Sequence, residues 1–154
     1  MKRTMLNCAI VLIALLTVNT AIAQSAKLKS PLTTTDNVKT LTVCYDITGL
    51  GNVSQVTMTL RYNAVVASEC FNPGNKQESV PGQNQTFSGV GDEFTVPVHN
   101  GRATGCFTTD EDEFQAGGCP SSSWRGSVTN VTFSNITLQV LGRTFSAQNP
   151  SPNP

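Results

Sequence analysis

Residues 55–70 read Gln-Val-Thr-Met-Thr-Leu-Arg-Tyr-Asn-Ala-Val-Val-Ala-Ser-Glu-Cys. Apolar side chains stand at every second position from Val56 to Tyr62, and the same parity continues to Cys70. Because successive side chains of a β-strand point to opposite faces, this period of two predicts a strand with one buried face. Its length predicts either one bent strand or two strands that meet near Asn63.

The same alternation recurs on both sides of this stretch. Residues 41–47 predict a strand that ends in a turn at 48–52, and further short strands are expected around 94–98, 103–107 and 124–140. Pro97 lacks a backbone donor, which places its strand at an edge or a bulge. His99-Asn100-Gly101 predicts a tight hairpin turn. The apolar parity changes near Asn130 and again near Asn135, which predicts a bulge and a turn there.

Seven or eight short strands without a helical stripe predict an all-β fold. We expect an antiparallel, immunoglobulin-like β-sandwich over residues 39–146. Residues 24–38 are polar and lack periodicity, so they are expected to form a flexible leader. Residues 147–154 are rich in proline and are expected to form a tail.

The first 23 residues have the pattern of an export signal. Lys2 and Arg3 precede an apolar run at 9–16, and Ala21-Ile22-Ala23 matches the small-x-small pattern of a cleavage site. Cys8 precedes the apolar run, whereas the cysteine of a lipoprotein follows it. The run is too short for a membrane anchor. We therefore expect a signal peptide over 1–23, no membrane insertion, and a protein in the periplasm or outside the cell.

Four cysteines remain after the signal, and export to an oxidising compartment predicts that they form disulfides. Four cysteines allow three pairings. Cys44 and Cys106 both stand on the polar parity of their strands, where two outward side chains on neighbouring strands can meet. Cys70 and Cys119 both stand where a strand meets a loop. This placement favours Cys44–Cys106 together with Cys70–Cys119.

The charge and the few reactive side chains exclude several function classes. Ten basic and ten acidic residues balance, and loss of the signal leaves a small negative excess, which argues against nucleic acid as a partner. His99 is the only histidine and stands in a turn, and the chain has no Gly-x-Ser-x-Gly motif. We therefore predict no catalytic residues, no metal site and no cofactor.

The run Asp-Glu-Asp-Glu at 110–113 is the densest cluster of charge in the chain. Four carboxylates could hold calcium, but the spacing of an EF-hand loop is absent. A run of like charge is ordinarily a solvated loop, which is the interpretation that we favour.

Other features have two interpretations each. Trp124 alternates with Gly126 and Val128, which favours a place in the core over a sugar-stacking role. Glycosylation sequons begin at Asn52, Asn84, Asn130 and Asn135.

Several segments together resemble a family of small exported, mostly bacterial proteins of unassigned function. The resemblance covers about residues 41–141 and is carried by 47–52 (Ile-Thr-Gly-Leu-Gly-Asn), 70–75 (Cys-Phe-Asn-Pro-Gly-Asn), 81–84 (Pro-Gly-Gln-Asn), and Cys119-Pro120 before Trp124. Asn75 stands where members have a second glycine. Cys44 and Cys106 stand where members have Ser, Thr or Val. The resemblance thus implies a family disulfide Cys70–Cys119, with Cys44–Cys106 as an addition, and it supplies no catalytic residues.

These observations predict a secreted, monomeric interaction module that acts without catalysis, with an unknown protein or glycan as its partner. The alternative is a secreted enzyme inhibitor or effector that acts through the loop at 72–84. The side chains expected to bind are amides, which both donate and accept hydrogen bonds: Asn72, Asn75, Gln77, Gln83 and Asn84.

Overall fold

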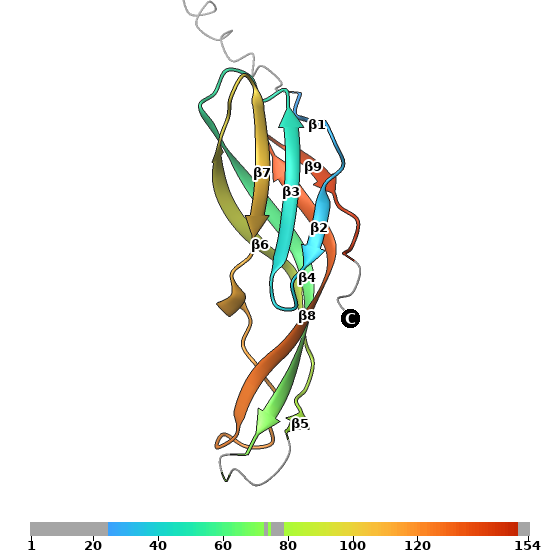
Figure 1. Ribbon diagram of the computed structural model, residues 1–154, viewed down its shortest axis with the longest axis vertical. Coiled ribbons are helices and arrows are strands. Elements are labelled where there is room, and N and C mark those ends of the chain that lie inside the picture. The colour runs from blue at the N-terminus through green and yellow to red at the C-terminus, as the bar shows by residue number, and fades with distance from the viewer. Residues whose placement is uncertain (1–24, 73, 75–78, 151–154) are drawn as a thin grey trace, which may run out of the picture.

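The computed structural model describes residues 25–72, 74 and 79–150 (Figure 1). The expected signal peptide at 1–23 lies outside these residues. The elements are β1 (Lys27–Leu28), β2 (Thr33–Asp36), β3 (Leu41–Thr48), β4 (Gln55–Phe71), β5 (Val80–Pro81), β6 (Gln85–Pro97), β7 (Arg102–Thr108), the 3-10 helix η1 (Glu111–Glu113), β8 (Arg125–Val140) and β9 (Arg143–Ser146).

The strands form two antiparallel sheets, as the alternation predicted. In the first sheet, β3 pairs with β7 along one edge and with β1 and β2 along the other. In the second sheet, β4 pairs with β8 on one side and with β6 and β5 on the other, and β9 pairs with β8. The chain crosses between the sheets after β3, β6 and β7, which is the crossing pattern of an immunoglobulin-like sandwich. The predicted fold class is therefore confirmed.

The structure differs from the sequence expectation at both flanks of the sandwich. Residues 24–38 were expected to be a flexible leader, but β1 and β2 lie within them and pair with β3. Ala26 and Leu32 are buried in the core, which explains why this polar segment is held. The expected tail begins with an ordered segment, because Ala147 N donates to Ile136 O at 2.9 Å and Thr34 Oγ1 donates to Gln148 O at 2.9 Å. Residues 151–154 lie outside the described residues.

The core lies between the two sheets. β3 alternates buried and half-buried side chains along its whole length, as does most of β4. The largest fully buried side chains are Tyr62, Phe133, Leu41, Ile47, Leu50, Met58, Leu60, Ile136 and Leu138. Phe94 and Phe107 stack with ring centroids 4.2 Å apart and so join β6 of one sheet to β7 of the other.

β4 and β8 are long strands that bulge instead of ending. The register of β4 against β8 shifts beside Asn63, so β4 is the single bent strand of the two alternatives that the sequence left open. The prediction of a turn near Asn135 was wrong: Asn135 has φ 52° but lies within β8, at this same register shift, where β8 has one residue more than β4. Asparagine tolerates this left-handed backbone, so one bulge restores the inward parity without ending the strand. The second shift in this pairing lies at Asn130, where a bulge was predicted.

β4 and β8 continue past the first sheet and form a narrow extension (Figure 1). We define the extension as residues 64–71, 79–87 and 125–133 together with residues 109–119, the part of the β7–β8 connection that we call the linker. Among the residues that the structure describes, no strand of the first sheet covers the inner face of β4 and β8 here (Figure 1). The linker covers it instead, because Phe114 is buried with its ring centroid 5.4 Å from that of Phe87 and 6.3 Å from that of Phe133.

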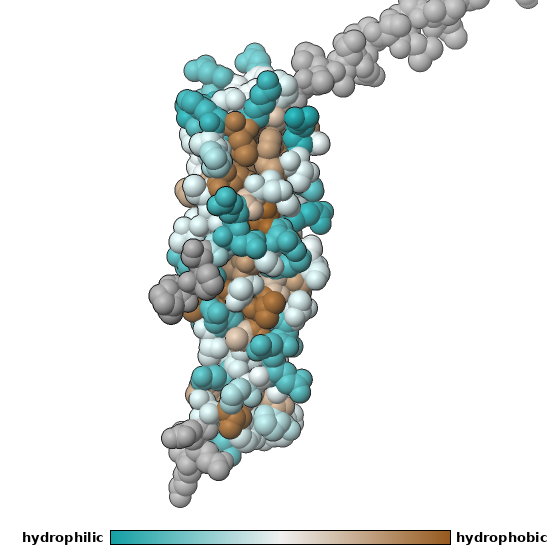
Figure 2. Space-filling model, turned by 90° about the vertical axis from the view of Figure 1, so that its right-hand side faces the viewer, coloured by the Kyte–Doolittle hydropathy of each residue, from teal (hydrophilic) through white to brown (hydrophobic). Residues whose placement is uncertain are grey.

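Figure 2 views the side on which β1, β2 and β9 lie. Apolar surface is broken into small patches between polar side chains on this face. Scattered apolar side chains are ordinary for a protein surface and mark no interface by themselves.

Candidate functional site

The described residues of the predicted binding loop (72, 74 and 79–84) lie at the far end of the extension, which we call the tip: residues 71, 72, 74, 79–84 and 119–125. β4 ends here at Phe71, and β8 begins here, with Phe71 and Arg125 as register partners. β5 pairs with β4 through Cys70 and Val80. The tip therefore consists of two chain segments joined by a β-ladder.

The structure places three of the five predicted amide side chains at this tip. Asn72 Oδ1 accepts from Gly74 N at 3.0 Å, so this side chain shapes the start of the loop. Gln83 and Asn84 are exposed. Asn75 and Gln77 lie outside the described residues.

The disulfide Cys70–Cys119 and a set of hydrogen bonds brace the tip. Cys70 is fully buried and bonded to Cys119, which fastens the end of β4 to the linker. Ser68 lies between three segments: its carbonyl accepts from Gly82 N at 2.7 Å, and its hydroxyl donates to Gly117 O at 3.1 Å. Gly118, with φ 73°, lies so close to Gln83 that a side chain at residue 118 would collide with it.

Two aromatic residues at the tip were missed or misplaced by the sequence analysis. Phe71 is 44% exposed and is the most exposed large apolar side chain of the described residues. Trp124 was expected in the core, which was wrong: it is half-buried and is not part of the core cluster. The parity of Trp124 with Val128 misled because β8 begins only at Arg125, after a turn in which Trp124 N donates to Ser121 O at 3.1 Å.

Both predicted disulfides are present. Cys44 and Cys106 are direct register partners on the outer face of β3 and β7. The strand parity predicted this pair correctly, and the pairing of Cys70 with Cys119 at strand ends is confirmed as well.

His99 lies at the opposite end of the molecule from the tip. The predicted hairpin turn is confirmed, because His99 and Arg102 exchange two backbone hydrogen bonds and Asn100 and Gly101 have positive φ. The described residues around this turn line a shallow hollow of about 400 Å³: Pro97, His99, Asn100, Arg102 and Thr104. Arg102 donates two 2.7 Å hydrogen bonds to Asp46, which leaves its guanidinium occupied by a carboxylate.

The acidic run at 110–113 is only partly the solvated loop that we expected. Asp110 Oδ1 caps η1 by accepting from Asp112 N, and the exposed Glu111 pairs with Lys39 at 3.3 Å. Glu113 instead turns inward to the hydroxyl of Tyr62. Within the described ranges, no group of three or more His, Cys, Asp or Glu side chains is arranged to hold a metal ion.

The Tyr62 hydroxyl lies between two carboxylates. It donates to Glu113 Oε2 and lies 3.1 Å from Asp92 Oδ2. Burial, reinforced by nearby Asp92 and Asp110, raises the pKa of the Glu113 carboxyl against the lowering effect of the Tyr62 hydrogen bond. Burial and the Glu113 hydrogen bond likewise raise the pKa of Tyr62. This cluster fastens η1 of the linker to β4 and β6.

Within the part of the chain that the structure describes, no helix is long and apolar enough to span a bilayer. Comparisons with known proteins find no match: no family model, no curated protein and no solved structure is similar enough to this chain to be counted as related.

Proposed function

We propose that this protein is a non-catalytic, extracytoplasmic interaction module that binds a protein or glycan partner through its tip. The observation that supports it is the exposure of Phe71 at the end of β4, directly after the fully buried Cys70. An exposed aromatic ring offers large contact area, and a rigid base lowers the entropy lost when a partner binds.

The surroundings of Phe71 supply directional contacts. Gln83 and Asn84 expose amide groups that donate and accept hydrogen bonds, and Arg125 is exposed opposite Phe71 in the ladder. An apolar centre with a polar rim is the usual composition of a specific interface.

An extracytoplasmic location is supported by the two disulfides, which persist in oxidising compartments. The export signal expected at residues 1–23 agrees with it. Both observations bear on where the protein works and leave the identity of the partner to experiment.

A second candidate function is that of an enzyme inhibitor or effector. It is favoured by the narrow shape of the extension, which ends in few strands (Figure 1). A narrow, disulfide-braced end could enter the cleft of an enzyme. The catalytic activity of a bound partner separates the two functions. An inhibitor abolishes that activity at equal molar amounts, whereas an interaction module leaves it unchanged.

The test compares variants of the oxidised protein for binding to extracellular protein extracts and to immobilised glycans. Phe71→Ser is expected to weaken capture of a partner about tenfold or more, as loss of a central aromatic contact does, and Gln83→Ala is expected to weaken it less. Val65→Ser is the matched control: Val65 is 37% exposed on the same face of β4, but away from the tip.

Leu141→Ser is a second control, since Leu141 is 43% exposed in the β8–β9 turn, at the opposite end. Equal binding by Phe71→Ser and by both controls would refute the tip as the contact surface. Substrate turnover that disappears in a His99→Ala variant would refute the non-catalytic proposal.

A further inference from the structure

The two disulfides of this protein have opposite surroundings. Cys70 is fully buried, and Cys119 is half-buried at the end of the linker. Cys106 is exposed and Cys44 is half-buried, and both side chains lie on the outer face of the first sheet. A reductant in solution therefore meets Cys106 directly, whereas Cys70 is closed to solvent and Cys119 is only partly accessible.

The exposed disulfide lies in a shallow depression of about 480 Å³. β3 and β7 form its floor, and the segment between β1 and β2 forms one wall. Its lining includes Ser30, Pro31, Thr33, Asp46, Thr104 and Cys106. The depression leaves room for a thiol to approach the sulfur atoms from outside.

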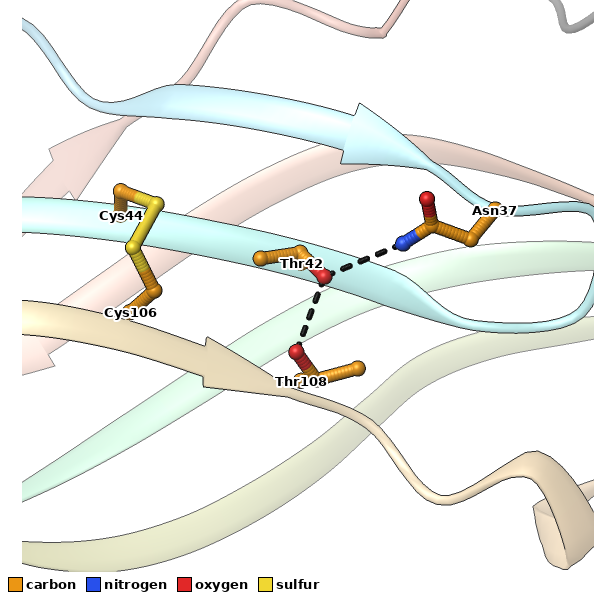
Figure 3. Close-up of a disulfide and its surroundings, with 5 residues drawn as sticks. All are labelled: Asn37, Thr42, Cys44, Cys106 and Thr108. Carbon is orange, nitrogen blue, oxygen red and sulfur yellow. Dashed lines mark hydrogen bonds between the residues drawn. A yellow bond between two sulfur atoms is a disulfide. The ribbon is translucent and has the colours of Figure 1, made fainter.

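The sheet does not depend on this disulfide for its pairing. β3 and β7 are register partners from Thr42–Thr108 to Thr48–Arg102, so backbone hydrogen bonds join them on both sides of Cys44. Figure 3 shows the disulfide beside the hydrogen bond between Thr42 Oγ1 and Thr108 Oγ1, which is 2.9 Å long. On the other side, Asp46 and Arg102 form their two-bond ion pair. These contacts remain when the sulfur–sulfur bond is cut.

We propose that Cys44–Cys106 is an exchange-active disulfide, which an external dithiol reduces while the protein stays folded. A thiolate of the dithiol attacks Sγ of Cys106, forming a mixed disulfide, and Cys44 leaves as a thiolate that takes a proton from water. The second thiolate of the dithiol then attacks the dithiol sulfur bound to Cys106, and Cys106 leaves as a thiolate that also takes a proton from water. The dithiol is oxidised to a disulfide by two electrons, and the protein gains two thiols.

Cys106 is the sulfur attacked because of its place in the sheet. β7 pairs only with β3 among the described strands, so it is an edge strand, and Cys106 is the more exposed partner. Cys44 lies on the central strand, with Thr33 of β2 as its register partner on the other side. Exposed disulfides are in general the labile ones, whereas buried structural disulfides resist reduction.

The first test treats the oxidised protein with dithiothreitol under native conditions. Free thiols are blocked at intervals with an alkylating reagent, and the labelled peptides are quantified by mass spectrometry. Cys44 and Cys106 are expected to be labelled at least about tenfold faster than Cys70 and Cys119, with an unchanged far-UV circular dichroism spectrum. Equal rates for the two disulfides, or labelling that occurs only as the spectrum is lost, would overturn the proposal.

The second test changes the charge of the depression. Thr104→Lys is expected to accelerate, and Thr104→Glu to slow, attack by the anionic thiolate, with rates about threefold apart at low salt and equal at high salt. Thr95→Lys and Thr95→Glu are the matched controls, because Thr95 is exposed on the second sheet. Rates that are the same in both Thr104 variants would overturn the route of attack through the depression.

Discussion

The sandwich and the extension share the same two long strands but bury them differently. In the sandwich, inward side chains of β4 and β8 pack against inward side chains of β3 and β7, so both sheets contribute to the core. In the extension, β4 and β8 meet a linker whose only regular element is η1, and Phe114 is its one buried apolar side chain. A strand can therefore keep its alternation of buried and outward side chains while the element that covers its buried face changes.

The two regions therefore depend on different interactions. The sandwich is stabilised by many interchangeable apolar contacts. The extension depends on a few particular ones: the Cys70–Cys119 disulfide, the Phe114 ring, and the hydroxyl of Tyr62 between its two carboxylates. Changes to these three should separate the stability of the extension from that of the sandwich.

The largest effect is expected from removing a disulfide. The bridges have sequence separations of 62 and 49, so loop-closure entropy assigns each about 4 kcal/mol of unfolding free energy. We expect similar losses in denaturant melts for Cys44→Ser/Cys106→Ser and Cys70→Ser/Cys119→Ser. Amide hydrogen exchange should differ: the second variant should lose protection mainly in the extension. Equal loss of protection across the whole protein would show that the two regions unfold as one unit.

A smaller effect is expected from Phe114→Ala. Phe114 is 7% exposed and contacts Phe87 and Phe133, so its truncation should lower the free energy of unfolding by about 3 kcal/mol. Phe71→Ala is the control, because this ring is exposed and its loss should change stability by less than about 0.5 kcal/mol. Both values come from urea denaturation. If Phe114→Ala cost no more than Phe71→Ala, the linker would not be a structural cover.

The smallest effect concerns pH. Burial raises the pKa of Glu113 above its ordinary 4.5, so the folded protein holds this proton more tightly than the unfolded chain does. The contribution of Glu113 to stability is full below pH 4.5 and declines as the pH rises through the raised value. Glu113→Gln cannot ionise, so it should exceed the parent in stability at pH 7–8 and equal it near pH 4. The gain should not exceed about 1 kcal/mol, since solvent screens this half-exposed group.

Glu111→Gln is the control for this prediction, because the side chain of Glu111 is 66% exposed and its pair with Lys39 is a surface contact. Thermal melts of both variants between pH 4 and pH 8 provide the measurement. A Glu113→Gln variant that is destabilised at pH 8 would show that the carboxylate stabilises the cluster in its charged form.

The sandwich was predictable because several of its strands repeat the same alternation of apolar and polar residues. Each of β3, β4 and β7 alternates over several residues, and the parity also placed Cys44 and Cys106 on one face. β1 and β2 were missed because these polar strands bury no side chain of their own, and the buried Ala26 and Leu32 stand just before them. A period of two cannot be seen in such short segments.

The candidate site was predictable only in outline. The turn-forming residues within 72–84 indicated a loop. The linker that covers the extension has no periodic pattern of apolar residues, because a single Phe114 follows four acidic residues. Trp124 was misjudged because β8 begins only at Arg125, so the alternation does not reach it. Glu113 was misjudged because its environment is set by partners distant in sequence, Tyr62 and Asp92. Local pattern carries no information about those partners.

β4 is one strand of 17 residues, and it belongs to both regions. At ordinary strand rise it is about 55 Å long, and it runs beside β8 along the long axis of the molecule (Figure 1). A partner that pulls on the tip along this axis would load β4 and β8 together, because both strands run from the tip into the sandwich. Tension applied at the tip would then pass into the sandwich along one pair of strands.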